Sequence, residues 1–228
     1  MTIDQFIKLL EAVAKILGAL AWPLVALFII WRLLPAVLRT IPELDNFSFD
    51  LFGFKASAER KKAAASEALS DAARKPIEGE TSRQIEANVQ AAREVVSRTV
   101  TPRVVKILHG KRILWVDDRP TNNVRERQAF EALGIRVDLA LNTKEALSLL
   151  APPCPFDLVI SDMGRPPHSS AGYTLLDALR KDHNPVPFVI YASSNAPEHK
   201  LEAKNRGAID CTNQANELFR IVTSALTA

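Results

Sequence analysis

Short apolar runs alternate with helix-like segments from Lys111 onward, and this alternation limits the possible folds more than any other feature. The runs have the length of buried strands, and the segments between them space their apolar residues as helices do. Five strands alternating with five helices predict a parallel sheet covered on both faces, and short right-handed connections favour a doubly wound layout. The expected strands are 112–117, 135–140, 156–161, 187–192 and 208–212, and the expected helices are 121–133, 143–150, 172–181, 198–206 and 213–226.

Local signals mark where several of these helices begin and end. Asn142 and Thr143 form a good helix start, with Glu145 close behind them. Gly134 and Gly207 stand where helices should end, because glycine readily adopts the left-handed conformation that closes a helix. These signals support the expected boundaries.

Three carboxylates follow two of the expected strands. Asp117 and Asp118 end the first strand, and Asp162 ends the third. The carboxyl ends of parallel strands meet at one edge of a sheet, so these acids should converge. Their mutual repulsion would be relieved by Mg²⁺, which prefers oxygen ligands, and a carboxylate beside such an ion can attack a phosphoryl group. One aspartate alone would be an ordinary loop residue, but three at these positions indicate a site.

Residues 111–226 resemble the receiver domain of bacterial two-component response regulators. The resemblance rests on the runs Ile113–Asp118 and Asp157–Asp162, and on Pro166 four residues further along. It also rests on Gly172 to Leu176 as a third-helix start, on Val186 to Ser193 as a fourth strand, and on Gly207-Ala208 before a fifth. The resemblance implies a flavodoxin-like α/β fold with five parallel strands in the order 2-1-3-4-5.

The same resemblance implies roles for individual residues. Asp162 would be the phosphoacceptor, and Asp117, Asp118, Asp162 and the carbonyl of Gly164 would hold Mg²⁺. A histidine kinase or another phosphodonor protein would be the partner. The chain would then signal through protein contacts and would be no enzyme.

Two positions depart from the pattern of that family. Receivers carry a Ser or Thr at the end of the fourth strand, where this chain has Ala192; Ser193 or Ser194 could contact phosphate only if the loop shifts by one residue. Receivers carry a Lys at the end of the fifth strand, where this chain has Gln214, and no lysine follows Lys204. The aromatic switch position of the fifth strand falls on Cys211, and Arg165 or Arg206 are candidates for the missing positive charge.

The N-terminal part is the most hydrophobic stretch. Ile16 to Trp31 contains no charged residue, and apolar residues continue on both sides over 5–38. This length predicts one transmembrane helix in preference to a signal peptide or a buried soluble helix. Arg32, Arg39 and later basic residues place the carboxyl side in the cytoplasm, which predicts a single-pass inner-membrane protein.

The stretch between the predicted anchor and the receiver-like part is predicted to form a stalk. Residues 47–54 favour a short strand or hairpin, or a phenylalanine cluster in the headgroup region, while 55–75 favour a helix. Thr81 and Gln84 have capping-box spacing for a further helix. Its apolar face could form a homodimer through residues 55–98, or could pack on the membrane or on the next domain. The expected regions are an anchor at 1–40, a stalk at 41–103 and a receiver-like domain at 104–228.

Composition restricts the function further. A net charge of +3 and the absence of a helix-turn-helix pattern argue against nucleic-acid binding. The four histidines lack ligand spacing, and Cys154 and Cys211 are too few for a disulfide scaffold. Three hypotheses remain: a membrane-anchored phosphorelay receiver, a pseudo-receiver that serves as an unphosphorylated docking module, and, less favoured, a membrane effector of a defence system. The acid triad argues against the third, for which no catalytic glutamate can be identified.

Overall fold

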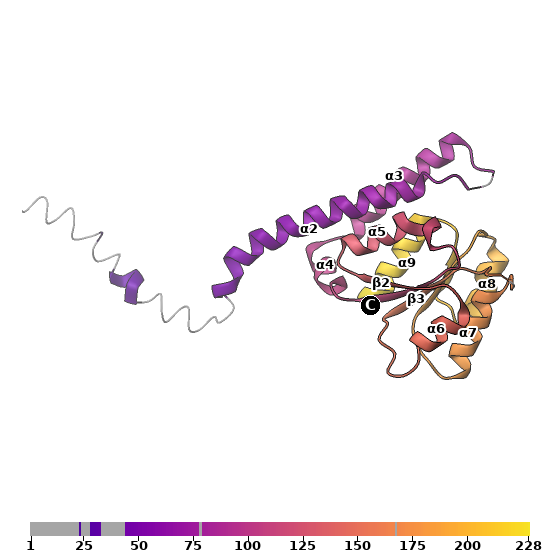
Figure 1. The fold of residues 1–228 in the computed structure, drawn as a ribbon. Coiled ribbons are helices and arrows are strands. Elements are labelled where there is room, and N and C mark those ends of the chain that lie inside the picture. Colours follow the sequence, from indigo (N-terminus) through magenta and orange to yellow (C-terminus); the bar gives the residue numbers. More distant parts are fainter. Residues whose placement is uncertain (1–22, 24–27, 33–43, 78, 167) are drawn as a thin grey trace, which may run out of the picture. The chain divides into compact units, whose positions relative to one another are not determined.

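A computed structural model describes residues 23, 28–32, 44–77, 79–166 and 168–228 (Figure 1). The chain divides into two compact units, residues 1–53 and 54–228. The second unit contains the sheet, the helices that cover it and every residue of the candidate site, so the following description concerns that unit.

The sheet has five parallel strands in the order β2-β1-β3-β4-β5, which confirms the predicted flavodoxin-like topology. Val116 at the end of β1 pairs with Ala140 on one side and with Ser161 on the other. The residues that follow Val116 and Ser161 therefore emerge level with each other at the same edge. The strands are β1 Arg112–Val116, β2 Arg136–Ala140, β3 Leu158–Ser161, β4 Phe188–Tyr191 and β5 Asp210–Thr212.

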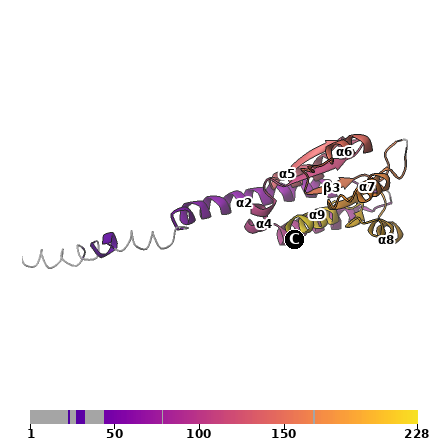
Figure 2. The same cartoon turned by 90° about the horizontal axis from the view of Figure 1, so that it is seen from below.

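Helices cover both faces of this sheet, above and below the strands in Figure 1, and Figure 2 shows the same helices from below. Phe130 of α5 and Phe219 of α9 belong to the core that includes Trp115, whereas Leu175 of α7 belongs to a second core that includes Leu114. Neighbouring residues of β1 thus point to opposite layers, as the pleat of a strand requires. The helices of these layers are η1 Pro120–Asn123, α5 Val124–Ala132, α6 Thr143–Leu149, α7 Ala171–Lys181, α8 Pro197–Asn205 and α9 Ala215–Thr227.

The expected boundary signals are present in the structure. The Asn142 side chain accepts a hydrogen bond from the backbone N–H of Glu145 at the start of α6. Gly134 and Gly207 have φ angles of 90° and 91° after α5 and α8, a region that side chains with a Cβ atom rarely adopt. The predicted strands and helices from residue 112 onward therefore lie within a few residues of the observed ones.

Three further helices precede the sheet: α2 Leu44–Ala73, α3 Ser82–Thr99 and α4 Pro102–Leu108. The strand or hairpin predicted at 47–54 is wrong, because this stretch is the first part of α2. Its alternation of apolar and polar residues is short, and the Ala-, Lys- and Glu-rich run that follows propagates a helix through it. The capping box of Thr81 and Gln84 is confirmed at the start of α3, whereas α4 was not expected.

The apolar face of α3 is buried within this unit. Val89, Ala92 and Val96 belong to the same core as Phe130 and Phe219, and α3 and α4 both contact α9. Of the arrangements that the sequence left open, α3 thus packs on the receiver-like part. A homodimer through residues 55–98 stays a prediction, and it would have to use a surface other than this face.

The predicted single-pass inner-membrane location is contradicted. Among the residues described here, no helix is both long enough and apolar enough to span a bilayer. With 30 residues α2 has sufficient length, but its charged side chains, such as Lys61 and Lys62, give it almost no net hydropathy. The expected anchor region 1–40 lies outside the described residues except for 23 and 28–32.

Candidate functional site

The three predicted acids come together at the carboxyl edge of the sheet. Asp117 and Asp118 follow β1, Asp162 follows β3, and one carboxylate oxygen from each lies within 4.8 Å of the others. Asp117 is buried, while Asp118 and Asp162 are half-buried. Gly172 at the start of α7 lies so close to this point that a Cβ atom would be 2.9 Å from the carbonyl oxygen of Asp162. Only a glycine therefore fits between α7 and the end of β3 without a shift of the backbone.

Local hydrogen bonds fix the directions of these carboxylates. Asp117 accepts bonds from the backbone N–H of Arg119, at 2.7 Å, and from the side-chain amide of Asn123. Asp162 accepts one from the backbone N–H of Met163, also at 2.7 Å. Asp118 has an ion pair with Arg119 at 3.7 Å. Each carboxylate keeps lone pairs that a further ligand could use.

The pKa of Asp162 is raised within this cluster. Burial, together with the negative charge of Asp117, raises the pKa of Asp162 to about 6, although the bond from Met163 and the charge of Arg165 act in the opposite direction. A divalent cation would relieve this repulsion, and clustered carboxylates are the hard oxygen donors that Mg²⁺ prefers. Gly164, the predicted carbonyl ligand, lines the same cavity as the three acids. The residues present therefore fit a magnesium ion.

Arg165 lies behind the acids, with its side chain 3% exposed. One guanidinium nitrogen, Nη1, donates to the Ser161 hydroxyl and to the Asp162 carbonyl, and the other, Nη2, donates to the Thr143 hydroxyl at 3.2 Å and to the Ala171 carbonyl at 3.0 Å. These bonds tie the end of β3 to the starts of α6 and α7. Because both terminal nitrogens are engaged with neutral oxygens, Arg165 adds positive charge behind the site without lining the cavity.

Arg206, the other predicted source of positive charge, is not part of the site. Its guanidinium pairs with Glu202 of α8 and Asp177 of α7 and lies 4.7 Å from the ring centre of Tyr173. It does not line the cavity in front of the acids. Although Arg206 precedes the fifth strand closely in the sequence, its side chain therefore does not reach the acids.

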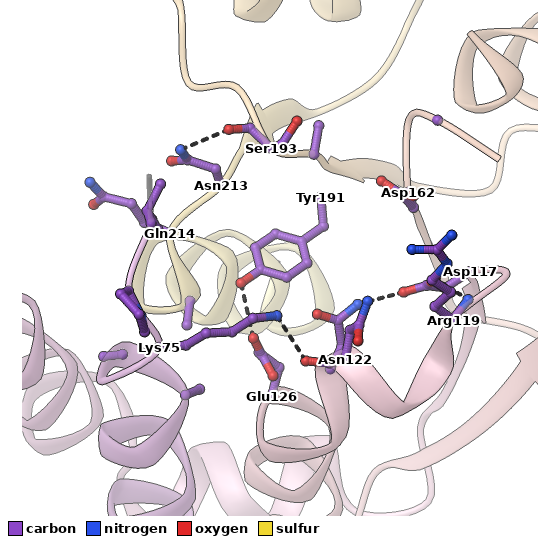
Figure 3. A pocket seen from close by; sticks show the side chains of 18 of the residues that line it. Lys75, Asp117, Arg119, Asn122, Glu126, Asp162, Tyr191, Ser193, Asn213 and Gln214 are labelled. Carbon is purple, nitrogen blue, oxygen red and sulfur yellow. Dashed lines mark hydrogen bonds between the residues drawn. The ribbon is translucent and has the colours of Figure 1, made fainter. Parts of the chain in front are cut away.

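A cavity of about 810 Å³ lies in front of the acids (Figure 3). Its opposite wall consists of Ala192 and Ser193 after β4 and Asn213 and Gln214 after β5. The Asn213 amide donates to the Ser193 carbonyl at 3.2 Å, which joins the two loops. This wall is neutral, in contrast to the acidic one.

The predicted phosphate-contact serines face different surroundings. Ser193 lines the large cavity, whereas Ser194 lines a smaller one of about 480 Å³ that also reaches Asp162. The Ser194 hydroxyl is 2.8 Å from Nδ1 of His199. Ala192 lines both cavities and offers only a methyl group.

Three residues of the large cavity were missed by the sequence analysis. Lys75, just after α2, donates from Nζ to the Asn122 carbonyl at 3.1 Å. The Tyr191 hydroxyl donates to Oε1 of Glu126 at 3.1 Å, and burial raises the pKa of Glu126. No motif marked Lys75, which follows an ordinary Ala-rich helix. The sequence around Glu126 predicts a solvent-facing position on a short helix.

Residues 113–223 match the family model of the response regulator receiver domain. No curated protein matches the chain. Similar solved structures include a Francisella response regulator receiver domain (25% identity, 51% of this chain and 96% of that chain, TM-score 0.45). They also include the non-phosphorylated HemR receiver domain from Leptospira biflexa (23%, 52% and 95%, TM-score 0.46) and the chemotaxis response regulator CheY4 of Vibrio cholerae (24%, 51% and 98%, TM-score 0.44).

Proposed function

We propose that this chain is a phosphorelay receiver in which Asp162 accepts a phosphoryl group from a histidine kinase or another phosphodonor protein. The observation that carries the proposal is the set of three carboxylates within 4.8 Å of one another at the carboxyl edge of the sheet, with a cavity in front of them. In such a set one carboxylate can act as a nucleophile while the other two offer oxygen ligands to a metal ion. The match of residues 113–223 to the receiver domain supports the same assignment.

The proposed reaction uses Asp162 in its ionised form. A carboxylate oxygen attacks the phosphorus of a phosphorylated imidazole, the P–N bond breaks, and the imidazole leaves with the electron pair and takes up a proton. A magnesium ion held by Asp117, Asp118, Asp162 and the Gly164 carbonyl would neutralise the charge on the phosphoryl oxygens. Without a bound metal ion the pKa of Asp162 is about 6, so even then the carboxylate is mostly ionised at neutral pH.

In this role the chain transmits a signal and has no turnover of its own. The product is an aspartyl-phosphate, and we propose that its output passes through contacts with other proteins. The cavity wall that faces the acids would decide how strongly the phosphoryl group is held.

A second role is favoured by one specific observation. The wall formed after β4 and β5 is neutral, with a methyl group at Ala192 and an amide at Gln214. Few hydrogen-bond donors there could bind a phosphoryl dianion. The domain could therefore serve instead as a docking module that is never phosphorylated. The acids would then be structural, and partner binding would not depend on Asp162.

One experiment distinguishes the two roles. The full chain is incubated with Mg²⁺ and acetyl phosphate, and its intact mass and melting temperature are measured. We expect an increase by one phosphoryl group, lost in Asp162→Asn and retained in Asp177→Asn, whose carboxylate lies exposed on α7. Wild-type protein without any adduct, and without a thermal shift on addition of beryllofluoride, would overturn the phosphorelay role and favour the docking module.

A further inference from the structure

The charges that line the large cavity are unevenly distributed. Four acids line it, namely Asp117, Asp118, Asp162 and Glu126, and the cations among the described lining residues are Lys75 and Arg119. The side chain of Arg119 is 74% exposed and faces Asp118 at 3.7 Å. Lys75 comes from the other side, from a helix that precedes the whole sheet (Figure 3).

The packing of α2 holds Lys75 at the cavity. Leu69 is 1% exposed in the core, and Ala72 and Ala73, the last two residues of α2, are buried and line the cavity. The backbone N–H of Lys75 donates to the Ala72 carbonyl at 3.1 Å. Asp71 lies 3.9 Å from Arg125 of α5, which adds a further attachment of this helix end. The position of Lys75 is therefore set by the core and not by its own surface contacts.

The ammonium of Lys75 has only a weak protein partner. Its hydrogen bond to the neutral Asn122 carbonyl uses one of three donors. No carboxylate of the described residues lies within 4.0 Å of Nζ, although its charge lowers the pKa of Glu126. Two donors thus remain for solvent or for an anion that enters the cavity.

A phosphoryl group on Asp162 would need such a donor. It would bring further negative charge into a space already lined by four acids, opposite the neutral ends of β4 and β5. Arg165 does not line this cavity, and its terminal guanidinium nitrogens already bind Ser161, Thr143 and backbone carbonyls. Among the described lining residues, Lys75 is the cation without a carboxylate partner.

We propose that Lys75 is the cationic ligand of the phosphoryl group on Asp162, and that it carries the phosphorylation signal into α2. This inference rests on the proposed function. On phosphorylation Nζ exchanges the Asn122 carbonyl for a phosphoryl oxygen, which alters the link between the end of α2 and the loop after β1. The helices that precede the receiver domain are then the part of the chain that responds.

The test compares Lys75→Gln, Lys75→Arg and Lys62→Gln. Lys62 lies on α2 and, like Lys75, donates to a carbonyl, that of Ser97 at 3.0 Å, so it is a matched control away from the cavity. Binding of beryllofluoride to the full chain is measured calorimetrically in the presence of Mg²⁺, together with the melting temperature of the free protein. We expect Lys75→Gln to weaken binding about tenfold, Lys75→Arg to recover most of it, and Lys62→Gln to leave it unchanged.

The outcomes separate this inference from the proposed function. If wild-type protein binds no beryllofluoride, the phosphorelay role itself fails. If wild-type and Lys75→Gln bind equally well, Asp162 remains the phosphoacceptor and the role of Lys75 is overturned. A lowered melting temperature of free Lys75→Gln, with unchanged affinity for beryllofluoride, would also overturn it, because Lys75 would then only attach the helix.

Discussion

The two walls of the cavity are built in the same way and carry opposite chemistry. Each consists of loops that follow parallel strands at one edge of one sheet. After β1 and β3 the loops present Asp117, Asp118 and Asp162, while after β4 and β5 they present neutral groups such as Ala192 and Gln214. The fold thus determines where side chains meet, whereas the charge at each position varies independently. The acidic half and the neutral half of such a cavity can therefore change separately.

The positive charges that balance the two walls also differ in origin. Behind the acidic wall, Arg165 is buried and its terminal nitrogens are hydrogen-bonded. On the neutral side, Lys75 is exposed and comes from α2, outside the sheet. The first charge is fixed and structural, and the second can change partners.

Replacement of Arg165 should have the largest effect. Arg165→Met keeps a similar volume but removes the charged donors that bind the Ser161 hydroxyl and the carbonyls of Asp162 and Ala171. Hydrogen bonds from a charged group contribute about 1.5–3 kcal/mol each, and the Ser161 hydroxyl still donates to the Asp162 carbonyl, so we expect the free energy of unfolding to fall by roughly 2–4 kcal/mol. Urea denaturation measures this. Arg206→Met, at an exposed guanidinium, should change it far less, and equal losses in both variants would contradict a structural role specific to Arg165.

Removal of the Asp162 charge should have the second-largest effect on the free energy of unfolding. The pKa of this carboxyl is raised from 3.8 to about 6 in the folded protein, so the folded state binds the proton more tightly than the unfolded state. Stability therefore falls as pH rises from about 4 to 6, and the loss persists above that window. Because this carboxyl is only half-buried, solvent screens part of the effect, so we expect Asp162→Asn, in the presence of a chelator, to be more stable than wild type by roughly 1–2 kcal/mol at pH 7 and to show no gain below pH 4.

Two additions sharpen this test. Mg²⁺ should stabilise wild type more than Asp162→Asn and so reduce the difference at pH 7. Asp177→Asn serves as the control at an exposed carboxylate. A gain that is the same at pH 4 and pH 7 would show that the effect does not come from the charge of Asp162.

Loss of the Tyr191 hydroxyl should have a smaller effect. Tyr191 ends β4 on the neutral side and donates to Glu126 of α5, whose pKa burial has already raised. Tyr191→Phe removes this donor from a buried carboxylate, which should cost about 1–2 kcal/mol at pH 8. Since a protonated Glu126 needs the donor less, the cost should shrink as pH is lowered. Thermal unfolding of both proteins across pH measures the difference, and a cost independent of pH would point to lost packing instead.

Much of the acidic wall could be predicted from the sequence, because it depends on strong local patterns. Buried parallel strands are recognisable apolar runs, and the residue that follows such a run must emerge at the carboxyl edge. Asp117, Asp118 and Asp162 could therefore be brought together from their positions alone. The strand order required the resemblance to a known family, since periodicity does not specify which strands are neighbours.

The remaining features depend on tertiary packing. The stretch 47–54 alternates like a strand over only a few residues, and the helix-forming run after it determines its conformation. Arg165 is buried because oxygens from the end of β3 and from the starts of α6 and α7 converge on it, and no local pattern shows this. Lys75 reaches the cavity because α2 and α3 pack in the same core as α9, which joins parts of the chain far apart in the sequence.

Addition of a charge to the neutral wall should have the smallest effect and tests the comparison most directly. Gln214→Lys places an ammonium after β5, on the same cavity as Lys75. If Lys75 already contacts the phosphoryl group, a second ammonium adds little, and beryllofluoride affinity should rise by no more than about threefold. In a Lys75→Gln background the same change should recover a larger part of the lost binding.

The two substitutions thus form a double-mutant cycle whose coupling is the measured quantity. Gln214→Met, of similar length but without charge, controls for changes in packing at the end of β5. Coupling between Lys75 and Gln214→Lys, absent with Gln214→Met, means that the two ammonium groups serve one anion. If Gln214→Lys raises beryllofluoride affinity equally in the wild-type and Lys75→Gln backgrounds, the two ammonium groups do not bind the same anion. Lys75 would then not compensate for the missing charge of the neutral wall.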